Sequence, residues 1–378
     1  MKRVYLDNAA TTPIASEVFD TMIPLLKEEF GNPSSSHSYG RQVKAILETS
    51  RRTIASKLNC SPAEIIFTSG GTEADNMAIH TSIESLGVKR IISSVIEHHA
   101  VGHTIEYFKD TFGIKIEYVN LDNKGNVDLQ DLELRLRTDE KTLVSLMHAN
   151  NEIGTLLPID RVSEICQKYN AIFHCDTVQT IGHLPIDLKE LNIDFITCAA
   201  HKLHGPKGVG FLYANKKNRT HSFIHGGSQE RGLRGGTENV YAIAGMAKAV
   251  ELACDEMNDH KQHVQGIKSY MIEKLSLLFD DMQFHGEVLP EKSLYTVLNC
   301  CFPKSENQGL LLFSLDLKGV ACSGGSACTS GANIGSHVLN GINADVTRPN
   351  VRFSFSRFTT TSDIDYALDQ LKSIYKLS

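Results

Sequence analysis

The sequence predicts an α/β protein with a mostly parallel sheet that carries helices on both faces, together with a smaller α+β domain. Two observations predict this fold. Apolar, strand-like runs alternate with helix-like segments through the first two thirds of the chain, an order typical of a parallel sheet covered on both faces. Polar and glycine-rich motifs directly follow the strand-like runs, at the carboxyl ends where open α/β sheets bind ligands.

Short apolar runs bounded by turn residues indicate the strands, and apolar residues at a helical spacing indicate the helices. Strands are expected at 64–68, at the start of 89–100, and at 142–147, 171–176, 194–200 and 209–214. Helices are expected at 73–86, 101–112 and 163–170.

The pattern changes near residue 240. Residues 239–279 have a continuous helical pattern, which predicts a long, bent or broken helix that joins two domains. Short strands are expected within 294–302 and 351–356, and a helix at 362–375. The segment 322–341 is rich in glycine, serine, alanine and asparagine, and is expected to form an irregular, flexible loop.

With 378 residues, the chain is longer than the roughly 150 residues of one typical domain, so two domains are expected. We expect a large ligand-binding domain at 13–255. The small domain is expected at 1–12 and 256–378, with the N-terminal strand joining the final third of the chain.

The charge balance disfavours direct nucleic-acid binding, because 38 lysines and arginines face 44 acidic residues, a net charge of −6. No apolar stretch approaches the roughly 20 residues that span a bilayer. The start, MKRVYLDNAATTP, lacks the apolar run of a signal peptide. The nine cysteines include no CxxC pair, so no metal site is expected. These features favour a cytoplasmic protein whose cysteines mostly fill the core.

A glycine-rich turn, TSGGTE (68–73), follows a predicted strand and opens a helix. Glycines let backbone N–H groups approach a phosphate, the helix N-terminus favours negative charge, and Thr72 adds a hydroxyl. The alternative is an ordinary turn in which Thr72 caps the helix.

Lys202 and Asp176 each follow a predicted apolar strand. A desolvated lysine amine is prepared to form a Schiff base, and a carboxylate at a strand end could hold a protonated ring nitrogen. The alternatives are a surface lysine and a helix-capping aspartate. Lys202 lies 26 residues after Asp176, a gap that fits one strand–helix–strand unit. A phosphate loop, an aspartate and a lysine in this order indicate a pyridoxal phosphate (PLP) site.

At this point the sequence resembles a known family over almost its whole length. It is similar to cysteine desulfurases of the NifS/IscS type, within the class V aminotransferase family of fold-type-I PLP enzymes. The motifs that carry the resemblance are YLDNAATT (5–12), GNPSSSHSYG (31–40), TSGGTEADN (68–76), EHHAV (97–101), MHANNEIG (147–154), HCDTVQ (174–179), AAHKLHGPKG (199–208), GGSQERGLRGGTENV (226–240), SGGSACTSG (323–331) and RFSFSRFTT (352–360).

The resemblance implies roles around the cofactor. Lys202 is expected to bind PLP covalently, Asp176 to pair with the pyridine nitrogen, and Gln179 to bond the ring hydroxyl. His98 is expected to stack on the ring, although a histidine in a loop is the simpler interpretation of its position without the family.

Further residues are implied at the two ends of the cofactor site. Thr72 and His201 are expected to contact the phosphate, and Thr237 to reach the phosphate of a partner subunit, which implies a homodimer. Asn151 and Arg352 are expected to hold the substrate carboxylate, because arginine suits a bidentate contact. The alternative for Arg352 is a surface ion pair.

Cys328 is implied as the catalytic nucleophile, in a small-domain loop where a thiol could move between substrate and acceptor. Without the family, a loop thiol with no role is the simpler interpretation. Cys322, six residues earlier, could relay sulfur or be incidental. One position departs from the family pattern: Ala199 stands where a serine hydroxyl usually contacts the phosphate.

The resemblance implies conversion of L-cysteine to L-alanine, with a persulfide on Cys328 that passes to an acceptor protein. Iron–sulfur scaffold proteins and tRNA-thiolation relays are the implied acceptors, although the chain ends at KSIYKLS without the extension that longer IscS-type enzymes use for docking. The alternatives are a selenocysteine lyase, another class V PLP enzyme such as an aminotransferase, or a non-catalytic sulfur-transfer scaffold.

Overall fold

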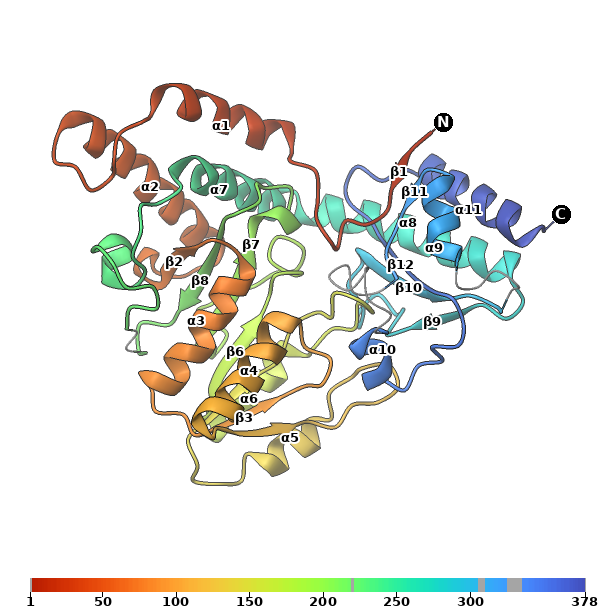
Figure 1. The fold of residues 1–378 in the computed structure, drawn as a ribbon, viewed down its shortest axis with the longest axis horizontal. Coiled ribbons are helices and arrows are strands. Elements are labelled where there is room, and N and C mark those ends of the chain that lie inside the picture. Colours follow the sequence, from red (N-terminus) through yellow and green to blue (C-terminus); the bar gives the residue numbers. More distant parts are fainter. Residues whose placement is uncertain (1, 219–220, 305–309, 325–334, 378) are drawn as a thin grey trace.

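The computed structural model describes residues 2–218, 221–304, 310–324 and 335–377. Its centre is a seven-stranded sheet in the order β2-β8-β7-β6-β5-β3-β4 (Figure 1). The strands are β2 (Ile65–Thr68), β3 (Arg90–Ser93), β4 (Lys115–Tyr118), β5 (Thr142–Ser145), β6 (Ile172–Asp176), β7 (Phe195–Ala199) and β8 (Gly210–Ala214). The five strands from β7 to β4 are parallel, and only β8 runs antiparallel to its neighbours β2 and β7.

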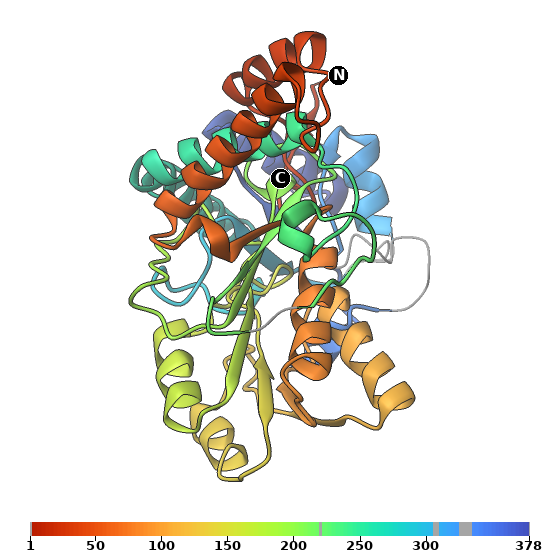
Figure 2. The ribbon, with the colours of Figure 1, turned by 90° about the vertical axis from the view of Figure 1, so that its left-hand side faces the viewer.

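Both faces of this sheet are buried, which is why its strands are almost continuously apolar. In β2, Ile66 packs into one core with α3 (Gly71–Glu84) and α4 (His99–Phe112). Its neighbours Ile65 and Phe67 pack into the core on the opposite face. The helices of that second face are α1 (Ser16–Glu28), α2 (Ser38–Lys57), α5 (Leu129–Arg135), α6 (Ile159–Lys168) and α7 (Val240–Asp255). Figure 2 shows α3 and α4 on one side of the sheet and α6 on the other.

A separate apolar core lies in the final third of the chain, where a three-stranded antiparallel sheet has the order β12-β10-β9. Its elements are α8 (Met257–Leu278), β9 (Gln283–His285), β10 (Val297–Cys301), α9 (Leu311–Leu317), β12 (Asn350–Ser354) and α11 (Thr361–Tyr375). The N-terminal strand β1 (Val4–Tyr5) pairs with β11 (Val320–Ala321). The division of the chain into domains at 13–255 and at 1–12 with 256–378 stays a prediction.

The long helical pattern at 239–279 is two helices, α7 and α8, separated at Glu256. Two expectations were wrong. The connection between β6 and β7 contains only turns in the structure, where a helix was predicted, because Gly182 (φ +76°) and Pro185 interrupt it. The segment 322–341, predicted to be irregular, includes helix α10 (His337–Gly341), whose first turn is capped by the Ser336 hydroxyl.

The helices of the described residues include none that is both long and apolar enough to cross a membrane.

Candidate active site

One cavity, of about 260 Å³, lies at the carboxyl ends of β6 and β7 and extends to β12 of the smaller core. It collects eight of the predicted site residues from six separate stretches of sequence. These residues are Thr72, His98, Asn151, Asp176, Gln179, His201, Lys202 and Arg352.

Lys202 follows β7 on a short 3-10 turn, η2 (Ala200–Lys202), that aims its side chain into the cavity. Its Nζ donates hydrogen bonds to the main-chain oxygens of Ala9 and Ala10, the latter at 2.9 Å. Gln179 Nε2 donates to the same Ala9 oxygen at 3.1 Å. Two backbone carbonyls that line the cavity therefore hold the Lys202 amine in place. Sequence reasoning missed Ala9 and Ala10, because alanine side chains give no chemical signal.

Asp176 is the last residue of β6 and is 6% exposed. Its Oδ1 accepts hydrogen bonds from Val178 N at 2.9 Å and Thr197 Oγ1 at 3.4 Å. Burial, together with the carboxyl group of Asp75, raises the pKa of Asp176 to about 6, and His98 opposes this shift. A buried carboxylate that lines the cavity is suited to a positively charged ligand atom.

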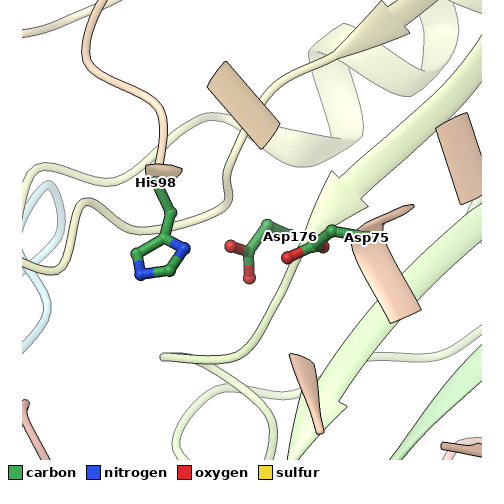
Figure 3. A group of neighbouring side chains, drawn as sticks. All are labelled: Asp75, His98 and Asp176. Carbon is green, nitrogen blue, oxygen red and sulfur yellow. The ribbon is translucent and has the colours of Figure 1, made fainter. Parts of the chain in front are cut away.

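Asp75 and His98 flank Asp176 (Figure 3). Atoms of the three side chains that could bind a metal lie within 4.8 Å of one another. Asp75 is fully buried on α3, and burial raises its pKa to about 7. Its Oδ1 lies 3.3 Å from His174 Nε2, while His174 Nδ1 lies 2.8 Å from Ser145 Oγ. Asp75 lines the same cavity beside Asp176, and its charge contributes to the raised pKa of Asp176. Sequence reasoning missed this residue.

His98 is the N-cap of α4, and its Nδ1 accepts a hydrogen bond from Ala100 N at 3.1 Å. Because Nδ1 is the acceptor, the neutral ring carries its proton on Nε2. Burial lowers the pKa of His98, which favours this neutral form. The cap therefore fixes the ring orientation at the cavity wall.

The N-terminus of α3 forms the polar end of the cavity. Gly70 has φ +156°, and a Cβ on Gly71 would lie 2.7 Å from Val178 Cγ2, so both positions favour glycine. Thr72 lies in the first turn. Nearby, His201 Nδ1 lies 3.1 Å from Thr11 Oγ1, and burial together with Lys202 lowers the pKa of His201 to about 4.

Arg352 reaches the cavity from β12 and is 1% exposed. Its Nη1 donates to the main-chain oxygen of Asn151 at 2.9 Å, and its Nη2 donates to Asp7 Oδ1 at 2.8 Å. Arg352 is therefore a buried guanidinium held in one orientation, and the surface ion pair considered as an alternative is wrong.

One described residue of the predicted set, Thr237, does not line this cavity. It is exposed in the loop after η3 (Gln229–Gly232), where Arg234 forms an ion pair with Glu73 at 2.8 Å. Cys328 lies outside the described residues. The nearby Cys322 is described, and burial raises the pKa of its thiol to about 12, so it is a poor nucleophile at neutral pH.

Comparisons with known proteins identify the family to which the chain belongs. The family model for Aminotransferase class-V matches residues 4–367. "Cysteine desulfurase IscS" of Dictyoglomus turgidum is 45% identical, over 99% of this chain and 95% of that protein. A solved structure of a "NifS-like protein" superposes with a TM-score of 0.91, at 36% identity and complete coverage of both chains. "SspA in complex with cysteine" superposes with a TM-score of 0.78, at 29% identity, covering 94% of this chain and 100% of that one.

The fold and the cavity define a fold-type-I PLP enzyme. The chain belongs to the class-V aminotransferase family, in which its relatives are named cysteine desulfurases. The residues present fit PLP. Lys202 would supply the amine for its aldehyde, Asp176 would face a protonated ring nitrogen as a buried carboxylate, and the α3 N-terminus would suit its phosphate.

Ala199 borders the phosphate end of the cavity, since its Cβ lies 3.7 Å from the position of a Cβ built on Gly71. We expect Ala199→Ser to tighten PLP binding roughly tenfold, because one hydrogen bond to a charged group contributes about 1.5–3 kcal/mol. The fraction of PLP lost from each variant during dialysis measures this change in affinity. The control is Ala63→Ser, which adds the same hydroxyl at an exposed position outside the cavity. Equal or faster PLP loss from Ala199→Ser than from the unmodified chain would contradict the prediction.

Proposed function

We propose that the chain is a PLP-dependent cysteine desulfurase that converts L-cysteine to L-alanine and leaves the sulfur as a persulfide on Cys328. One observation carries this proposal. A single cavity joins the amine of Lys202, the buried carboxylate of Asp176 and the guanidinium of Arg352, in a chain whose relatives are cysteine desulfurases. The cavity thus offers a group for each end of an amino-acid substrate.

Arg352 and Asn151 orient the substrate. The guanidinium plane of Arg352 presents N–H groups to the α-carboxylate, and burial strengthens this contact because water does not screen it. With the carboxylate held there, the substrate amine is directed toward Lys202, which lines the same cavity.

Lys202 moves a proton. When bound, PLP draws electron density away from the substrate Cα and so makes its proton acidic. With cofactor and substrate bound, the Nζ of Lys202 would accept this proton and later return it. The Ala9 and Ala10 carbonyls, which bind Nζ, keep it near this position. His98, with its proton on Nε2, is placed to exchange a further proton at the cavity wall.

Cys328 takes the sulfur in this proposal. Its thiolate forms an S–S bond with the substrate sulfur, and the bond between that sulfur and the substrate Cβ breaks. The electron pair of the broken bond stays on carbon, which is protonated to the methyl group of alanine. This step balances without an external oxidant, because the carbon is reduced as the two sulfur atoms are oxidised to the persulfide.

We expect Asp176→Asn to slow alanine release from L-cysteine by roughly 100-fold or more. The asparagine keeps the shape and the bond to Val178 N but removes the charge that holds a ring nitrogen protonated. Breaking a buried ion pair costs about 3–5 kcal/mol. The measurement is kcat with the cofactor content checked by absorbance. A loss of less than about threefold would contradict the role of the charge.

The partners of the proposed enzyme follow the family. We propose a homodimer in which the loop carrying Thr237 reaches the phosphate site of the partner subunit. We also propose that the enzyme is cytoplasmic. The acceptor of its sulfur is proposed to be an iron–sulfur scaffold or a tRNA-thiolation relay. The exposed position of Thr237 supports a contact outside its own subunit.

The proposal is tested by adding L-cysteine to the PLP-loaded chain and measuring alanine, with L-selenocysteine assayed in parallel. We expect alanine from L-cysteine. Alanine from L-selenocysteine alone would favour a selenocysteine lyase, and no alanine from either amino acid would favour a non-catalytic scaffold.

A further inference from the structure

Asp7 binds Arg352 from behind the cavity. Its Oδ1 accepts hydrogen bonds from Arg352 Nη2 and from Ser323 Oγ, both at 2.8 Å. The Asp7 side chain is 18% exposed, while that of Arg352 is 1% exposed. Arg352 lines the cavity, whereas Asp7 is not among its lining residues. Any effect of Asp7 on a substrate in this cavity therefore passes through Arg352.

The backbone fixes where these side chains meet. Ser323 N donates to Arg352 O at 3.2 Å, and Arg352 N donates to Ser323 O at 2.7 Å. Asp7 forms a parallel bridge with Ser354, two residues beyond Arg352 in β12. Because the main chain already sets the position of β12, the Asp7 carboxylate can act on the orientation and charge of the guanidinium.

The guanidinium is held at both ends. Nη1 binds the Asn151 carbonyl and Nη2 binds Asp7, so the plane of the group has little freedom to rotate. Bidentate recognition of a carboxylate depends on this plane, because the two N–H groups must face the two oxygens together. Asp7 also offsets the buried positive charge before a substrate arrives.

We propose that Asp7 is a positioning residue that sets the guanidinium plane of Arg352 for the α-carboxylate of an amino-acid substrate. The proposal rests on the proposed function, in which Arg352 binds that carboxylate. Asp7 thereby contributes to the choice of amino acids over simple amines, although it does not touch the substrate.

The test compares Asp7→Ala and Asp7→Asn in the PLP-loaded full chain. We expect Asp7→Ala to raise KM for L-cysteine about tenfold and to change kcat less than about twofold. The reason is that losing one hydrogen bond to a charged group weakens binding by about this factor. The amide oxygen in Asp7→Asn can still accept from Nη2, so this variant is expected to restore part of the loss. The control Glu164→Gln removes a 2.8 Å contact with Arg161 on an exposed surface and is expected to leave KM unchanged.

A binding readout separates positioning from general damage. L-Alanine carries the carboxylate and ethylamine lacks it, and both amines can be titrated through the visible absorbance of the lysine-bound cofactor. Asp7→Ala is expected to weaken the binding of L-alanine about tenfold and to change the binding of ethylamine by less than about twofold. Equal weakening of the binding of both amines, or a KM of Asp7→Asn below that of the unmodified chain, would overturn the proposal. If Asp7→Ala does not fold, the same comparison with Asp7→Asn decides.

This titration needs no turnover. Failure of the proposed function would appear as absence of alanine production by the unmodified chain, whatever the Asp7 variants bind.

Discussion

Lys202→Ala is expected to abolish both the visible absorbance of the lysine-bound cofactor and the release of alanine from L-cysteine. Lys202 is the amine of the cavity that follows β7, and its Nζ is held by the Ala9 and Ala10 carbonyls. Loss of an acid–base group alone lowers a rate by about 10²–10⁴-fold. Loss of the covalent link to the cofactor adds to this effect. Absorbance and an alanine assay on the same preparation measure both consequences.

Lys202→Arg is the matched control for this prediction. Arginine keeps a positive donor for the Ala9 and Ala10 carbonyls, but it remains protonated and forms no Schiff base. We therefore expect Lys202→Arg to retain more thermal stability than Lys202→Ala. It is expected to lose the same absorbance and activity. Alanine release from Lys202→Arg at more than about 1% of the original rate would contradict the assignment.

Cys328→Ser is expected to keep the cofactor absorbance and the binding of L-cysteine but to lower alanine release by about 100-fold or more. A serine hydroxyl is a far weaker nucleophile toward sulfur than a thiolate, because it stays protonated at neutral pH. The reaction then stops after the substrate is bound and its Cα proton has been removed. The measurement is alanine release, with substrate binding followed through the absorbance change.

Cys322→Ser is the matched control, six residues earlier in the sequence. The thiol of Cys322 has a pKa raised to about 12 by burial, so its loss is expected to change the rate less than about twofold. Full turnover by Cys328→Ser, or an equal loss in both variants, would show that Cys328 is not the nucleophile.

The strands of the central sheet were predictable because both of their faces are buried, which makes them apolar throughout. The edge strand β4 (Lys115–Tyr118) was missed, since its residues are half-buried or exposed and alternate in polarity. The 26-residue gap between Asp176 and Lys202 was expected to fit a strand–helix–strand unit, but the connection from β6 to β7 is made of turns. Helix α10 was missed because its five residues lie within a glycine-rich segment.

The candidate site was predictable where side chains carry the chemistry, as with Lys202, Asp176 and Arg352. The missed partners act through backbone atoms or through contacts with the predicted residues. Ala9 and Ala10 contribute carbonyl oxygens, Asp75 lines the cavity beside Asp176, and Asp7 binds Arg352 from outside the cavity lining. Such contacts depend on how distant segments meet in the fold, as with Asp7 Oδ1 and Arg352 Nη2 at 2.8 Å across 345 residues of chain.

A single turnover with one equivalent of L-cysteine tests the central claim most directly. After mixing, alanine is quantified and the cysteine-containing peptides are examined by mass spectrometry under non-reducing conditions. The account predicts one alanine for each active site and one added sulfur atom on the peptide containing Cys328, with none on the peptide containing Cys322. Alanine formed with the sulfur on a different cysteine, or no alanine at all from the PLP-loaded chain, would contradict it.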